Sequence, residues 1–81
     1  MEKRIGAILI IVNSKEQINL LNQILTSHSP IIIGRQGIPI REKGISVISL
    51  VVEGTTDDIG ALAGQLGKLK GIRVKSLMAK D

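Results

Sequence analysis

Few side chains in this sequence could take part in catalysis or metal binding. The 81 residues include one histidine, His28, and no cysteine, which excludes disulfides, iron–sulfur ligation and thiol catalysis by this chain. A metal site, or a nucleophile with its base, needs several such groups close together. His28 follows a stretch with helical spacing, where the helix dipole favours a histidine. We therefore expect no catalytic residue, no metal site and no cofactor.

One pair of carboxylates, Asp57 and Asp58, has a spacing that could hold a cation or move a proton. Thr55 precedes Asp58 by three residues, which is the spacing of a capping box at the start of a helix. Both carboxylates would then lie in the first turn, where the helix dipole stabilises negative charge. Capping explains the pair without a catalytic or magnesium-binding role.

Anion binding is the remaining chemistry that the sequence offers. The run G-R-Q-G at residues 34–37 lies within an expected strand rather than before a helix, so the phosphate-loop mechanism does not apply to it. The helix starts at Ser14 and Thr55 suit an anion better, although capping alone explains them. Arg35 and Arg41 could form a charged rim for a ligand or a partner subunit. They could equally be solvated residues of an edge strand and its turn.

Two segments, residues 4–12 and 45–53, are expected to be the central strands of a sheet. Both faces of each segment are largely apolar, and Ser46 and Ser49 interrupt the pattern in the second segment. A strand that is apolar on both sides is normally covered on both sides. We expect helices to cover one face of this sheet and a partner to cover the other.

Two further segments are expected to be edge strands. Residues 31–40 contain Pro39, which cannot donate a ladder hydrogen bond and so indicates an edge or a bulge. The glycines of this segment also indicate bulges or close backbone approach. Residues 72–79 carry Arg73 and Lys75 on one face, and charged side chains protect an edge from aggregation.

Two amphipathic helices separate these strands. Ser14, followed by Gln17 at the third position, predicts a capping box for the first helix, which ends before Pro30. The second helix begins after Thr55, with Asp57 and Asp58 in its first turn, and contains Gly60 and Gly64. We expect these two glycines to let the second helix lie close against the sheet, because glycine otherwise lowers helix stability.

The order strand–helix–strand–strand–helix–strand predicts an α+β, ferredoxin-like βαββαβ sandwich. Such a fold has a four-stranded antiparallel sheet with two helices on one face. Residues 31–54 would form its long hairpin, in which Gly44 adopts a left-handed conformation. We expect a single domain over residues 1–81. The uncovered sheet face predicts a homodimer or homotetramer, packed sheet to sheet or edge to edge.

The composition limits the partners of the chain. There is no Phe, Tyr or Trp and the formal net charge is +4. Aromatic platforms that stack on bases are therefore excluded, and the small positive charge does not by itself indicate nucleic-acid binding. No apolar run has the ~20 residues of a membrane span. We expect a cytoplasmic protein without a membrane partner.

Two longer motifs give a family resemblance. The run G-R-x-G-I-P-x-R-E-K-G-I-S at residues 34–46 and the run S-L-V-V-E-G-T-T-D-D-I-G-A-L at residues 49–62 resemble the iron-only hydrogenase system regulators. The opening E-K-R-I-G and the closing G-I-R-V-K-S also fit that family. The family is ACT-like and is similar to the C-terminal regulatory domain of the nickel-responsive repressors.

The resemblance implies a ferredoxin-like fold, a dimer or tetramer, and a regulatory role near hydrogenase genes. In ACT-like domains small ligands often lie between the loop after the first strand and a neighbouring subunit, which here implies Asn13, Ser14 and Lys15. With Arg35 and Arg41 from the hairpin, these are the predicted ligand-binding residues. Nickel binding is not implied, because the repressors use several histidines and a cysteine. The N-terminal DNA-binding arm of the repressors is also expected to be absent.

Three functions follow from these observations. The first is a non-enzymatic, oligomeric, ACT-like regulatory module that senses a small-molecule effector or a protein partner, including proteins of the hydrogenase system. The alternative is a transcriptional regulator that binds nucleic acid through basic surface residues, although the sequence argues against direct DNA binding. The third is an acylphosphatase-type enzyme. That activity needs a glycine-rich turn with an arginine, where this chain has Asn13, Ser14 and Lys15.

Overall fold

The computed structural model of the chain describes residues 2–79. Strands and helices alternate in the predicted order, and short 3₁₀ turns lie before α1, after it and at the tip of the hairpin. The strands and helices are β1 (Arg4–Val12), α1 (Ile18–Ser27), β2 (Ile32–Ile40), β3 (Ile45–Gly54), α2 (Thr56–Gly67) and β4 (Ile72–Met78).

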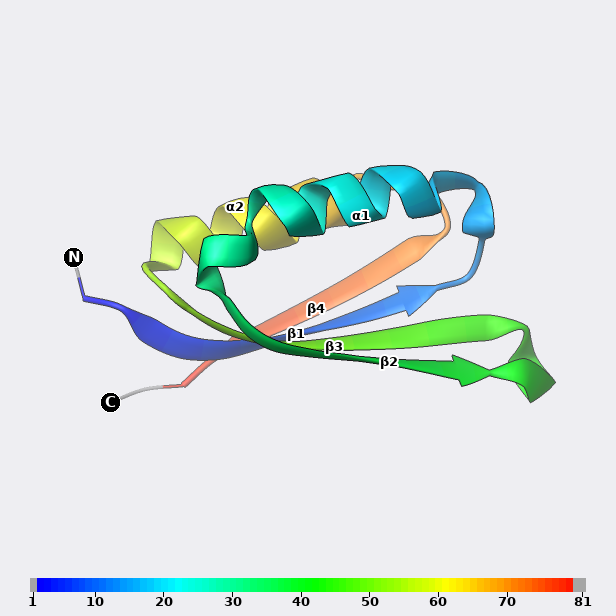
Figure 1. Cartoon of the computed structure of the whole chain (residues 1–81), viewed down its shortest axis with the longest axis horizontal. Helices are drawn as coiled ribbons and strands as arrows, with labels where there is room; N and C mark the ends of the chain where they lie inside the picture. Colours follow the sequence, from blue (N-terminus) through cyan, green and yellow to red (C-terminus); the bar gives the residue numbers. More distant parts are fainter. Residues whose placement is uncertain (1, 80–81) are drawn as a thin grey trace.

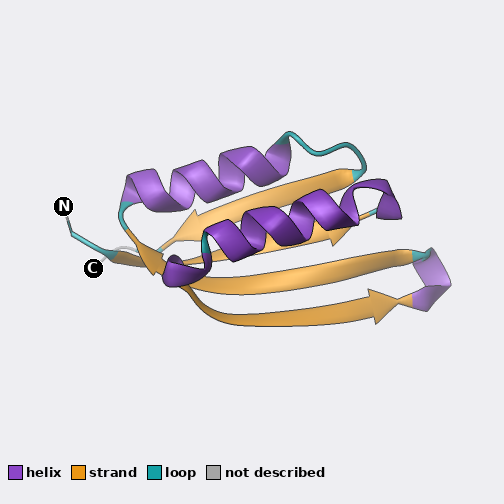
Figure 2. Ribbon diagram, turned by 45° about the horizontal axis from the view of Figure 1, so that its top comes forward, coloured by secondary structure: helices purple, strands orange, loops and turns teal. Residues whose placement is uncertain are grey.

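The strands form one antiparallel sheet in the order β2-β3-β1-β4. Both helices lie against the same face of this sheet (Figure 1), and a tilted view shows them side by side above the strands (Figure 2). The predicted α+β, ferredoxin-like βαββαβ sandwich is confirmed. The doubly apolar strands β1 and β3 are central, and the strands with Pro39 and with Lys75 are the edges.

The hydrophobic core lies between the helices and the sheet. Alternate residues of the central strands point toward the helices, so that Ile8, Ile10 and Leu50 are fully buried. Leu21 of α1 and Leu62 of α2 meet them from the helix side and are also fully buried. The core is aliphatic throughout, because the chain has no aromatic side chain.

The long hairpin has the predicted turn but a single irregularity in its ladder. Gly44 adopts the left-handed conformation, with φ of 65°, after the 3₁₀ turn Arg41–Lys43. The register of β2 and β3 shifts between Ile32 and Gly34, whereas Pro39 pairs regularly with Ser46. Pro39 therefore marks the edge position of β2, and the bulge lies at the other end of the strand.

The predicted capping box of the first helix is wrong in one half. Ser14 Oγ accepts a hydrogen bond from the Glu16 N–H at 3.3 Å, but Gln17 does not reach back to Ser14. Its Oε1 accepts instead from the backbone N–H of Lys70 at 2.8 Å. The first turn, Lys15–Gln17, is a 3₁₀ turn, and α1 begins at Ile18.

The second helix begins as predicted. Thr55 Oγ1 accepts from the Asp58 N–H at 3.1 Å, and Asp58 Oδ2 accepts from the Thr55 N–H at 3.1 Å. The interpretation of Gly60 and Gly64 is wrong, because a Cβ atom at either position would have nothing within 4 Å. Both lie on the exposed side of α2, while Ile59, Leu62 and Leu66 pack against the sheet.

Candidate ligand-binding site

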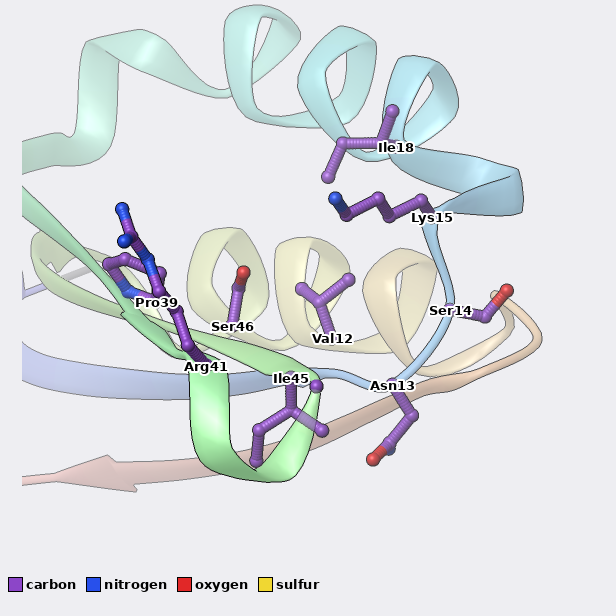
Figure 3. Close-up of a pocket in the computed structure, with 10 residues that line it drawn as sticks. Val12, Asn13, Ser14, Lys15, Ile18, Pro39, Arg41, Ile45 and Ser46 are labelled. Carbon is purple, nitrogen blue, oxygen red and sulfur yellow. The ribbon is translucent and has the colours of Figure 1, made fainter.

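A cleft of about 400 Å³ opens at the end of the sheet, between the β1–α1 connection and the tip of the β2–β3 hairpin (Figure 3). Four of the five predicted ligand-binding residues line it, namely Asn13, Ser14, Lys15 and Arg41. The remaining lining residues are Val12, Ile18, Pro39, Gly44, Ile45 and Ser46. The cleft thus joins two segments that are separated by more than twenty residues in the sequence.

The β1–α1 connection is held in place by Gly71. The N–H of Asn13 donates to the carbonyl oxygen of Gly71 at 2.7 Å. Gly71 has a φ of 73°, and a Cβ atom there would lie only 2.6 Å from Ser14 Cβ. This position needs glycine for its conformation and for the close approach. The connection therefore leaves β1 along a fixed path, which brings Lys15 to the mouth of the cleft.

The hairpin places Arg41 on the opposite side. Arg41 begins the 3₁₀ turn, and its carbonyl oxygen accepts from the Gly44 N–H at 3.2 Å. The ladder immediately before the turn pairs Ile40 with Ile45 and Pro39 with Ser46. Two regular pairs and a closed turn give Arg41 a defined backbone position at the rim.

The side chains differ in whether they point into the cleft. Lys15 extends beneath Ile18 toward the hairpin, and Arg41 extends from the hairpin toward α1 (Figure 3). The side chains of Asn13 and Ser14 point away from this space (Figure 3), and Ser14 Oγ is used in capping. The two cations are therefore the groups that can contact a bound molecule, while Asn13 and Ser14 shape the connection.

Val12 and Ser46 form the floor of the cleft, and the Ser46 hydroxyl points to the helix side of the sheet (Figure 3). Ile18 supplies aliphatic surface above Lys15, whereas the Ile45 side chain points to the other side of the sheet (Figure 3). Sequence reasoning missed Ser46, because its place in the cleft depends on its pairing with Pro39 in the hairpin. Two cations beside the aliphatic side chain of Ile18 can bind a small molecule that carries a carboxylate or phosphate and an apolar part.

Two other predicted features lie elsewhere. Arg35 pairs with Leu50 and is exposed on β2, four residues before Pro39, so it does not line the cleft. His28 follows α1, and its Nε2 lies 3.3 Å from Gln65 Oε1 of α2.

Across residues 2–79 no three His, Cys, Asp or Glu side chains gather as metal ligands. No helix in that range is both long and apolar enough to cross a membrane.

The architecture places the chain among ferredoxin-like α+β proteins. A protein of unknown function from Galdieria sulphuraria has a TM-score of 0.65 at 12% identity, over 99% of this chain and 47% of that one. The divalent ion tolerance protein CutA1 from Ehrlichia chaffeensis has a TM-score of 0.50 at 12% identity, over 100% of this chain and 86% of that one. At these identities the likeness concerns the fold alone.

A more specific relation comes from the uncharacterized protein TM1266 from Thermotoga maritima. It is 38% identical, with a TM-score of 0.92 over 98% of this chain and 100% of that chain. The model of the TM1266-like family, "Iron-only hydrogenase system regulator, putative", matches residues 4–76. The chain belongs to the TM1266-like family. No curated protein matches the sequence.

Proposed function

We propose that this chain is a non-enzymatic, oligomeric regulatory module of the iron-only hydrogenase system, which senses a small anionic molecule in the cleft. One observation carries the proposal: Lys15 and Arg41 extend into the same cleft from two separate elements. The family to which the chain belongs supports the regulatory role. The aliphatic, cysteine-free composition supports binding rather than catalysis.

The geometry of the cleft supports a small ligand. Its volume of about 400 Å³ lies within the range of roughly 300–1,000 Å³ that small-molecule sites occupy. A carboxylate or phosphate between Lys15 and Arg41 would make charge-assisted hydrogen bonds to both. The apolar part of the same molecule would cover the partly exposed Ile18, which removes aliphatic surface from water.

Binding in this position would link two segments that the fold leaves separate. Lys15 follows β1 and Arg41 follows β2, so a ligand that contacts both would fix the hairpin tip relative to α1. A ligand that binds only the folded state stabilises it by about 2.7 kcal/mol at a hundred times its dissociation constant. A regulatory partner, including a protein of the hydrogenase system, would detect the fixed position of the hairpin tip in the ligand-bound state.

Thermal unfolding with small carboxylates and phosphates tests the ligand proposal. Circular dichroism is the suitable readout, because the chain lacks Tyr and Trp. We expect at least one compound to raise the unfolding midpoint, and the shift to disappear in Lys15→Ala and Arg41→Ala. Lys43→Ala is the matched control, because Lys43 belongs to the same turn but does not line the cleft. An equal shift in all three variants would contradict the proposed site.

A further inference from the structure

The sheet face opposite the helices, called the open face below, exposes several large aliphatic side chains, and neither helix covers it. Ile5, Leu9, Ile38 and Val51 keep between 44% and 46% of their surface exposed, and Leu77 keeps 73%. A depression of about 360 Å³ lies over Ala7 and is lined mainly by aliphatic side chains of β1, β3 and β4. Exposed apolar surface of this extent normally marks an interaction site.

We propose that the open face is the interface between two copies of this chain, related by a two-fold axis that runs along the strands between β1 and β3. Self-association is part of the proposed function, and the surface and arrangement of the two copies are the additional step. The axis places β1 over the partner's β3 and β4 over the partner's β2. Each strand then packs against a strand with a different set of side chains.

The side chains across one row of the sheet support this axis. The strand pairing places four residues in one row across β4, β1, β3 and β2, namely Leu77, Ala7, Val51 and Gly34. The two-fold axis reverses the row, so that Leu77 faces the partner's Gly34 and Val51 faces the partner's Ala7. Gly34 offers open space, with nothing within 4 Å of a Cβ atom. The depression over Ala7 can receive the partner's Val51, and large side chains opposite small ones let two layers interdigitate.

The next row shows the same complementarity. It aligns Lys75, Leu9, Ser49 and Gln36 across the sheet. Under the same axis Leu9 faces the partner's Ser49, and Lys75 faces the partner's Gln36, which can accept a hydrogen bond from an ammonium group. The row therefore pairs a large side chain with a small one and a cation with a neutral acceptor.

Other arrangements of two copies are less favourable. An axis across the strands would stack β4 on the partner's β4 and gather Arg73 and Lys75 of both copies, where like charges repel. Pairing through the edge of β2 would meet Pro39 and the bulge between Ile32 and Gly34, and both interrupt a continuous ladder. The axis along the strands avoids both problems, and its least favourable row is the one that places Arg73 opposite the partner's Ile38.

The size of the open face matches a second sheet. Four strands at about 4.8 Å spacing and seven residue positions give a face of roughly 19 Å by 20 Å. Because side chains make the accessible surface larger than this flat area, a pair of copies would bury on the order of 1,000 Å² in total. A specific interface needs about that much buried area. A single helix, about 10 Å across, would leave half of the width uncovered.

Sedimentation of the full chain tests which face is used. We expect a mass of twice 8.7 kDa, or a multiple of that pair, and a twofold lower mass in Leu9→Asp and Leu77→Asp. Leu20→Asp is the matched control, because Leu20 is 47% exposed on α1 against 44% for Leu9. Leu77 is the most exposed of these residues. We therefore expect Leu77→Asp to retain the fold, as measured by circular dichroism, even if Leu9→Asp unfolds. A monomeric wild type would overturn the self-association, and unchanged assembly of Leu77→Asp would overturn the interface alone.

Cross-linking tests the axis, because the chain has no native cysteine. Gln36→Cys and Lys75→Cys are mixed and treated with a bismaleimide that spans about 10 Å, the spacing of packed sheets. We expect efficient cross-links between the two variants and at least tenfold fewer within Lys75→Cys alone. Efficient cross-linking within Lys75→Cys alone would overturn the axis along the strands. Ligand binding in the cleft is measured separately, so a failure here leaves that proposal standing.

Discussion

At the scale of single residues, Gly71 controls the path by which the chain enters the cleft. It combines a positive φ with a contact at which any Cβ atom would meet Ser14. It also accepts the hydrogen bond from the Asn13 N–H. Its conformation therefore determines the backbone position from which the Lys15 side chain extends, although Gly71 itself does not line the cleft.

We expect Gly71→Ala to lower the free energy of unfolding by about 1–3 kcal/mol, which is the cost of a non-glycine residue in the left-handed backbone region. The contact with Ser14 adds to this cost. Urea denaturation followed by circular dichroism measures the change. Gly37→Ala is the control, because a Cβ atom at Gly37 meets nothing within 4 Å. Equal stability of the two variants would contradict the role of Gly71.

The sequence could indicate the cations of the cleft but not its floor. Lys15 and Arg41 follow two strands that the predicted topology brings to the same end of the sheet, so their proximity follows from element order. The part played by Ser46 depends on its pairing with Pro39, and this register is set by the hairpin turn, because the ladder is regular from Ile40 to Gly34. Arg35 has the same chemistry as Arg41 but lies several residues away along β2.

At the scale of elements, α2 contains two glycines whose replacement should make the fold more stable. Gly60 and Gly64 are exposed in the helix interior, and neither approaches another element. Gly60→Ala and Gly64→Ala should therefore each raise the free energy of unfolding by about 0.8–1 kcal/mol, because alanine has the higher helix propensity. Urea denaturation measures both. A loss of stability in either variant would indicate that the helix face is covered by a partner.

A single side-chain hydrogen bond joins the 3₁₀ turn before α1 to the α2–β4 connection. Gln17 Oε1 accepts from the Lys70 N–H, so Gln17→Ala should lower the free energy of unfolding by about 0.5–1.5 kcal/mol. Gln23→Ala on the exposed side of α1 controls for the loss of a glutamine. Similar stability of the two variants would show that the hydrogen bond contributes little.

The order and pairing of the elements could be predicted because the evidence is local. Alternating apolar residues in β1 and β3 indicate coverage on both faces, and Pro39 excludes β2 from the centre of the sheet. The role of Gln17 could not be predicted, because its partner Lys70 is 53 positions away. Local spacing favoured a capping box with Ser14, and a tertiary hydrogen bond replaced half of it.

At the scale of the whole molecule, folding and assembly should be linked. If two copies bury their open faces, the unfolding midpoint rises with protein concentration by mass action. We expect this dependence in the wild type and its absence in Leu77→Asp, as measured by thermal circular dichroism over a hundredfold range of concentration. A wild-type midpoint that is independent of concentration would contradict a dimer that stabilises the fold.

The net charge of +4 leaves direct DNA binding as a testable alternative. Binding through phosphates weakens steeply with salt, and the chain lacks aromatic side chains that stack on bases. We expect no salt-dependent binding to DNA from its own promoter in an electrophoretic mobility assay. A complex that forms at low salt and dissociates as salt rises would favour the transcriptional regulator instead.

Native mass spectrometry of the protein purified from its own host tests the regulatory account most directly. The account predicts an even number of chains that carry a reproducible additional mass, and this mass is absent when Lys15 and Arg41 are both replaced by alanine. The additional mass would also identify the small anionic molecule. A chain that is monomeric, or an assembly that never carries a ligand in the wild type, would contradict the proposed sensing role.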